Sequence, residues 1–124
     1  MGISSHENDY RLVWAINNEL KTQFVKTENL VKDLQGHNDR LEFSCFTFHD
    51  QERYLTFTLI SNRCPDGFLF PELKNIDFLM RIQGEISDRE LKEINQDIKS
   101  VPVISASFIM DPGKIKGISR ILQV

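Results

Sequence analysis

Residues that interrupt regular structure are scarce in this sequence, which has 6 glycines and 4 prolines among 124 residues. That scarcity excludes collagen-like and low-complexity chains. Long apolar runs are missing too: the longest is Leu12–Ile16, whereas a membrane-spanning helix needs about 20 apolar residues. The N-terminus also lacks the charged and then apolar pattern of a secretory signal. We therefore expect a soluble protein with no membrane partner.

Cysteine is equally rare, since the chain has only Cys45 and Cys64. Two cysteines do not make a disulfide framework, and neither belongs to a C-x-x-C pair that binds zinc or exchanges disulfides. Cys45 lies in an alternating apolar run and is expected to be a small buried hydrophobe, whereas Cys64 lies in a turn. The expected location is a reducing cytoplasm.

Neither sign of charge dominates, because 15 basic and 18 acidic residues leave a net charge of -3. Nucleic-acid-binding domains usually carry a basic face and a high isoelectric point, so DNA is not an expected partner. Hydrophobic residues make up 40% of the chain. Residues 1–124 are therefore expected to form a single domain around one core.

The first helical pattern follows Asp9, the expected N-cap. Leu12, Ile16 and Leu20 recur at intervals of four residues, as on the buried face of an amphipathic helix. Trp14 falls within this helix, and is expected either at the edge of the core or at an interface.

The second helical pattern begins with a capping box formed by Ser87 and Glu90. An apolar stripe follows over residues 91–98. Strand-like segments at 76–82 and 103–110 flank this helix. The three segments predict a β-α-β unit, which crosses over right-handed if its strands are parallel and share a sheet.

Apolar and polar residues alternate over 41–48 and 54–60, which predicts an antiparallel hairpin. Phe46 and Phe48 on its second face indicate that this face is partly covered too. Residues 24–34 are compatible with a strand or a short helix, and residues 115–122 with a short amphipathic helix. The segments together predict an α+β, two-layer sandwich: a mainly antiparallel β-sheet with two helices packed on one face.

The segment FPELKNIDF, from Phe70 to Phe78, resembles the signature of the IPExxxVDY family, a group of small bacterial proteins named for that motif. Pro71, Glu72 and Asp77 match the signature, whereas its Ile, Val and Tyr are replaced. Further stretches similar to this family are Gly2–His6, Asp9–Leu12 with Trp14 and Asn17, and Leu59–Arg63. The family has no established activity, so the resemblance implies no mechanism.

The resemblance implies an apolar strand before the segment that corresponds to Gly2–Ser4, and this sequence, which starts at Met1, is expected to lack that strand. The resemblance therefore implies an unpaired sheet edge, which is a potential pairing site. Ser4 and Ser5 are expected to cap the first helix, and the alternative is that they help to bind an anion there.

Four polar residues near the motif are candidate ligand-binding residues: Arg63, Glu72, Lys74 and Asp77. The structural interpretation is that Glu72 pins the loop after Pro71 while Asp77 fixes the entry to the next strand. The alternatives are ligand binding and, last, acid–base catalysis. Arg63 is expected either to pair bidentately with Glu72 or to receive a carboxylate or phosphate ligand.

No metal site is expected, because His6, His37 and His49 are far apart and lack H-x-H or H-E-x-x-H spacing. The sequence has no P-loop, G-x-G-x-x-G or G-x-S-x-G motif. We therefore identify no catalytic residue and expect no cofactor, which makes an enzyme the least favoured class.

Two functional hypotheses remain. The first is a non-catalytic protein-interaction or adaptor module, which self-associates or binds a protein partner through Trp14 and a free sheet edge. The alternative is a small-molecule-binding regulatory domain, in which Arg63, Glu72, Lys74 and Asp77 hold an amino acid or another small charged metabolite. RNA binding by the phenylalanines of the sheet ranks third, because a basic surround is missing.

Overall fold

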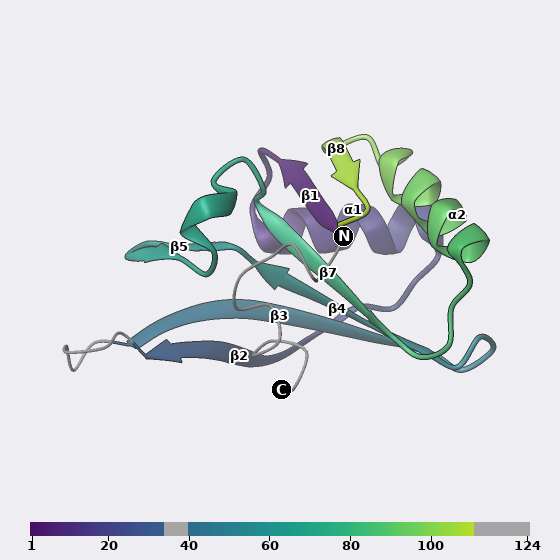
Figure 1. The fold of residues 1–124 in the computed structure, drawn as a ribbon, viewed down its shortest axis with the longest axis horizontal. Coiled ribbons are helices and arrows are strands. Elements are labelled where there is room, and N and C mark those ends of the chain that lie inside the picture. Colours follow the sequence, from purple (N-terminus) through teal and green to yellow (C-terminus); the bar gives the residue numbers. More distant parts are fainter. Residues whose placement is uncertain (34–39, 111–124) are drawn as a thin grey trace.

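The fold is an α+β arrangement, which a computed structural model describes over residues 1–33 and 40–110 (Figure 1). His37 and the helix expected at 115–122 lie outside these residues. The elements, in chain order, are β1 (Gly2–Ser5), α1 (Asp9–Leu20), β2 (Val25–Asp33), β3 (Arg40–Asp50), β4 (Leu55–Ser61), β5 (Arg63–Cys64), β6 (Gly67–Phe68), a 3-10 helix η1 (Pro71–Leu73), β7 (Phe78–Gln83), α2 (Asp88–Lys99) and β8 (Ile104–Phe108).

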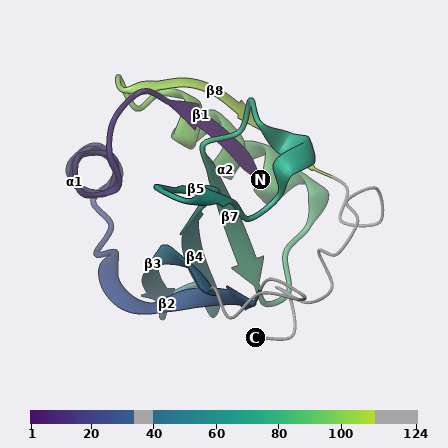
Figure 2. The same cartoon turned by 90° about the vertical axis from the view of Figure 1, so that its left-hand side faces the viewer.

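Six strands form one sheet in the order β2-β3-β4-β7-β1-β8, and each neighbouring pair is antiparallel. The predicted α+β class and the mainly antiparallel sheet are confirmed, as is the hairpin of β3 and β4. The ambiguous segment after α1 is strand β2. Figure 2 shows the sheet curving from β8 and β1 at the top to β2 and β3 at the bottom.

The predicted β-α-β unit is present, with a strand inserted into it. Both β7 and β8 run antiparallel to β1, which lies between them, so they are parallel to each other and α2 connects them. The inserted strand β1 was not predicted. Gly2–Ser5 is too short to show an alternating pattern, and only its partners on both sides define it as a strand.

Gly2 has neighbours that leave little room for a side chain at this central position of β1. It lies opposite Leu79 of β7 and Phe108 of β8. A Cβ atom built on it would come within 2.7 Å of both the Ile76 Cδ1 and the Met110 Sδ atoms. Real Cβ atoms do not approach other atoms so closely, so a larger residue would force the neighbouring side chains apart.

The N-cap of α1 is Asn8, not Asp9 as the sequence indicated. The Asn8 side chain accepts a hydrogen bond from the Arg11 backbone N–H at 3.0 Å. Asn and Asp are equally good caps, so the local pattern did not distinguish adjacent positions. Ser5 does not cap the helix end either: its hydroxyl donates to the Val103 carbonyl at 2.7 Å. The predicted cap of α2 is confirmed, since the Glu90 N–H donates to the Ser87 hydroxyl at 3.1 Å.

Within the described residues, the larger of two hydrophobic clusters covers the face of the sheet on which the helices lie. Alternate residues of β3, β4 and β7 point into it, and buried residues of both helices belong to the same cluster. Its members include Leu12, Ile16, Phe46, Phe57, Leu59, Met80, Ile94 and Ile98. The prediction that the face with Phe46 is covered is confirmed.

The opposite face is closed by the segment that connects β4 to β7. Leu69, Phe70 and Ile76 of this segment pack on a second cluster of strand residues. Those strand residues are Leu41, Phe43, Cys45, Ile60 and Leu79. Because β4 and β7 are hydrogen-bonded neighbours in the sheet, the segment that connects them folds back over a face of the same sheet.

The side chain of Asn62 holds this connecting segment and is fully buried, with 0% exposure. Its oxygen accepts a hydrogen bond from the Phe70 N–H at 2.8 Å. Its amide nitrogen donates to the carbonyls of Leu73 at 3.0 Å and Ile76 at 2.9 Å. An amide side chain suits this position because it can donate and accept at once.

Replacing Asn62 by Ala is expected to lower the free energy of unfolding by about 2–4 kcal/mol, because the Phe70 N–H and the Ile76 carbonyl lose their side-chain partner in a buried site and the Leu73 carbonyl keeps only the Ile76 N–H. Urea denaturation measures the loss. The matched control is Asn75→Ala, at an exposed asparagine in the same segment, which is expected to change stability by no more than about 0.5 kcal/mol. Equal losses in the two variants would contradict the assignment.

Candidate functional site

Two of the four predicted site residues meet at the start of β7. Arg63 and Asp77 form an ion pair through Arg63 Nη2 and Asp77 Oδ1. The second carboxylate oxygen of Asp77 accepts a hydrogen bond from the Ser5 N–H at 2.8 Å. The Asp77 side chain is 13% exposed and that of Arg63 is 52% exposed. Asp77 therefore joins the end of β1 to the turn after β4.

The backbone of Asp77 makes the same connections. Its N–H donates to the Ile3 carbonyl at 2.9 Å, and its carbonyl accepts from the Asn62 N–H at 2.9 Å. These contacts support the structural interpretation of Asp77, in which it fixes the entry to the strand. A residue so placed cannot change without disturbing β1, Asn62 and the turn at Arg63.

Glu72 and Lys74 lie apart from that pair, exposed in and just after the helix η1. Within the described ranges, neither side chain has a hydrogen-bond or ion-pair partner. The expected pair between Arg63 and Glu72 is wrong, because Asp77 takes the guanidinium instead. Asp77 is the better partner because its backbone is bonded on both sides of the site and its carboxylate is already held by Ser5.

Trp14 lies exposed on the surface of α1 and not at the edge of the core. It is 69% exposed, and Tyr10, one turn earlier on α1, is 65% exposed. The two rings line an open groove of about 430 Å³ together with Glu7, Arg11, Ala15 and Val103. Tyr10 also meets the ring of Phe46 edge to face, with centroids 5.5 Å apart, so its orientation is set by the core beneath it.

The sheet edge formed by β2 has features that discourage pairing with another chain. Its register with β3 breaks between Thr27 and Leu30, and Lys26 and Lys32 lie along it. Bulges and lysines are the devices by which edge strands avoid aggregation. Within the described residues the other outer strand is β8, which has only five residues.

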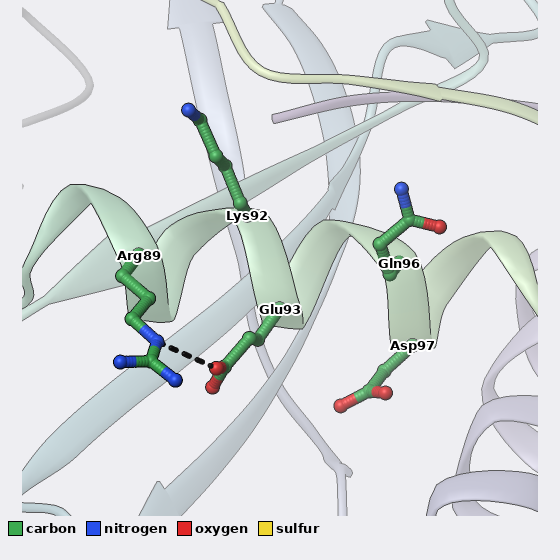
Figure 3. Close-up of a pocket in the computed structure, with 5 residues that line it drawn as sticks. All are labelled: Arg89, Lys92, Glu93, Gln96 and Asp97. Carbon is green, nitrogen blue, oxygen red and sulfur yellow. Dashed lines mark ion pairs between the residues drawn. The ribbon is translucent and has the colours of Figure 1, made fainter.

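A hollow on the outer side of α2 has a volume of about 450 Å³, but no polar groups converge on it (Figure 3). Its lining comes from this helix alone: Arg89, Lys92, Glu93, Gln96 and Asp97. Arg89 and Glu93 pair with each other at 3.4 Å, and Lys92 and Gln96 point the other way (Figure 3). This is the solvated face of an amphipathic helix.

The His, Cys, Asp and Glu side chains of residues 1–33 and 40–110 are dispersed over the structure. No three His, Cys, Asp or Glu side chains in these ranges come together as a metal site would require. Cys45 and Cys64 are both free thiols. Burial raises the pKa of the Cys45 thiol, which lowers the fraction present as reactive thiolate.

Comparisons with family models, with curated proteins and with solved structures found no match to this chain. The similarity of residues 70–78 to the IPExxxVDY signature therefore stays a prediction. None of the helices in the described part of the chain is long and apolar enough to cross a membrane.

Removing the two partners of the Arg63–Asp77 pair is expected to have unequal effects. Arg63→Met loses a half-exposed ion pair and is expected to cost up to about 1 kcal/mol of stability. Asp77→Ala also leaves the buried Ser5 N–H without its acceptor, and is expected to cost about 2–3 kcal/mol. Urea denaturation of both single variants and the double variant measures these losses and their coupling. Unchanged stability in Asp77→Ala would instead favour a ligand-binding role.

Of the two thiols, Cys64 is expected to react with iodoacetamide well before Cys45, because Cys45 is buried and its thiol pKa is raised. Peptide mass spectrometry after brief labelling near neutral pH measures the order. In urea the two rates should converge, since only the fold separates them. Faster labelling of Cys45 in the folded protein would contradict the structure.

Proposed function

We propose that this protein is a non-catalytic protein-interaction module that associates with a second copy of itself through the exposed face of α1. The observation that carries the proposal is the pair of aromatic rings, Tyr10 and Trp14, exposed one helical turn apart beside a groove. Tyr and Trp are the residues that most often dominate protein interfaces, together with Arg. Arg11 lies on this same face.

Charge favours a second copy as the partner. Glu7 and Arg11 lie one turn apart on the same face, with their charged groups 3.8 Å apart. When two copies meet about a two-fold axis, each residue pair occurs twice. Two antiparallel α1 helices would then set Glu7 of each copy against Arg11 of the other. The α1 faces of two copies are therefore complementary in charge, and this complementarity needs no other partner.

The alternative, a small-molecule-binding regulatory domain, has less support from its four candidate residues, Arg63, Glu72, Lys74 and Asp77. Arg63 is already paired with Asp77, so a carboxylate or phosphate ligand would have to displace a partner that the fold holds in place. Glu72 and Lys74 are exposed on the surface. The α1 face is therefore the stronger candidate for the protein's main contact.

Self-association is expected to bury the only tryptophan of the chain, so raising the protein concentration should shift its fluorescence to shorter wavelength as dimers form. Sedimentation equilibrium measures the dimer directly. Trp14→Ala is expected to weaken it about thirtyfold or more, as for an interface hot spot. Its fold should be little affected because the side chain is exposed.

The matched control is Tyr54→Asn, at an exposed aromatic on the β3–β4 turn. Asn suits the positive φ of 54° at this position. The control should dimerise like the wild type. Wild-type protein that stays monomeric at all concentrations, or a Trp14→Ala dimer of unchanged strength, would refute the proposal. Native mass spectrometry of protein purified from its own cells would then show whether a different polypeptide is bound.

A further inference from the structure

A separate apolar pocket opens where the end of α1, the C-terminal half of α2 and strands β3, β4 and β7 meet. Its volume is about 220 Å³, and it shares no lining residue with the groove beside Trp14. Protein interiors are usually packed without voids much larger than a water molecule. An apolar cavity of roughly 150 Å³ stays dry and takes up benzene, so this one has room for a phenyl or branched alkyl group.

Three phenylalanine rings form its aromatic wall. Phe48 of β3 and Phe57 of β4 stack, with centroids 5.9 Å apart and planes at 17°. Phe24 meets both rings at an angle, at 5.6 Å and 6.3 Å. Aromatic rings in such arrangements attract one another beyond their burial, which keeps the wall in place without a ligand.

Phe24 is additionally held by the side chain of Asn17 on α1. The oxygen of Asn17 accepts from the Phe24 N–H at 2.8 Å, and its nitrogen donates to the Phe24 carbonyl at 3.1 Å. The same oxygen accepts from the Thr22 hydroxyl at 2.9 Å. The segment that leaves α1 is thus fixed over the pocket, and the pocket is largely preformed, as ligand sites usually are.

The rim of the pocket carries one positive and one negative group. The Arg53 guanidinium lies 5.7 Å from the centroid of the Phe57 ring. Its Nε donates to Asp50 at 2.7 Å, and this bond lowers the pKa of the Asp50 carboxyl. The terminal nitrogens of Arg53 donate no hydrogen bond within residues 1–33 and 40–110. Asp97 of α2 also lines the pocket, and its carboxylate is exposed and unpaired within those same residues.

From this pocket we infer that the protein binds a small zwitterion with an apolar side chain, an aromatic or branched α-amino acid. The side chain enters among Phe24, Phe48 and Phe57, the ligand carboxylate accepts from Arg53, and the ammonium donates to Asp97. A ligand with only a carboxylate would meet the charge of Asp97, and one with only an ammonium would meet Arg53. A zwitterion satisfies both, and its charged hydrogen bonds are the strong kind.

Isothermal titration calorimetry with L-phenylalanine and L-leucine tests the inference on the whole wild-type chain. Binding of at least one of them is expected, with a rise in melting temperature because ligand binds only the folded state. Three compounds separate the contributions of the groups: 3-phenylpropanoate lacks the ammonium, 2-phenylethylamine lacks the carboxylate, and toluene lacks both. Each should bind at least about tenfold more weakly than L-phenylalanine.

Asp97→Asn removes the carboxylate and is expected to weaken binding of the amino acid at least about tenfold, while leaving that of 3-phenylpropanoate unchanged or improved. The matched control is Glu93→Gln, one turn away on the same side of α2 (Figure 3) and outside the pocket. It should bind like the wild type.

Three results would overturn the inference: no binding of either amino acid, equal binding of toluene and L-phenylalanine, or equal losses in Asp97→Asn and Glu93→Gln. The inference does not depend on the proposed dimer. Trp14→Ala should bind the amino acid like the wild type.

Discussion

A single buried amide, that of Asn62, holds the segment on which one whole face of the sheet depends. Burying such a group without partners is costly, and Asn62 avoids that cost because Phe70, Leu73 and Ile76 present their backbone groups to it. Leu69, Phe70 and Ile76 are thereby held against the strands. The position of Asp77 also depends on Asn62, because the Asp77 carbonyl accepts a hydrogen bond from the Asn62 N–H. The contacts of Asp77 with Arg63 and with β1 therefore depend on Asn62 too.

Asn17 performs the same task on the other face. Its side-chain amide bonds both the N–H and the carbonyl of Phe24, as a neighbouring strand would, and so fixes the chain where it leaves α1. Both asparagines sit at the end of a regular element, where backbone groups lose their regular partners. Both hold an aromatic residue against the sheet, and so contribute to a cluster as well as to a hydrogen-bond network. Asn17 thereby holds Phe24 in the wall of the pocket near Arg53.

The polar residues of the motif region therefore divide by role. Asp77 is occupied by the fold on both its backbone and its side chain, whereas Glu72 and Lys74 remain on the surface. The two surfaces that supply the proposals, the Tyr10–Trp14 face and the pocket near Arg53, lie on or beside the helices. Arg53 itself had no motif to mark it. Its place beside the pocket depends on the pairing of β3 with β4, which sets the Arg53 guanidinium over the Phe57 ring.

Elements with local signals can be predicted from the order of the residues alone. The hairpin of β3 and β4 follows from strict alternation, and α2 follows from its capping box and apolar stripe, because both depend on residues close together in the chain. Tertiary structure decided what local patterns do not contain. Strand β1 is defined by partners far along the chain, and Asp77, not Glu72, pairs with Arg63 because Ser5, 72 residues away, fixes its carboxylate. The pocket, likewise, needs α1, α2 and the sheet to meet.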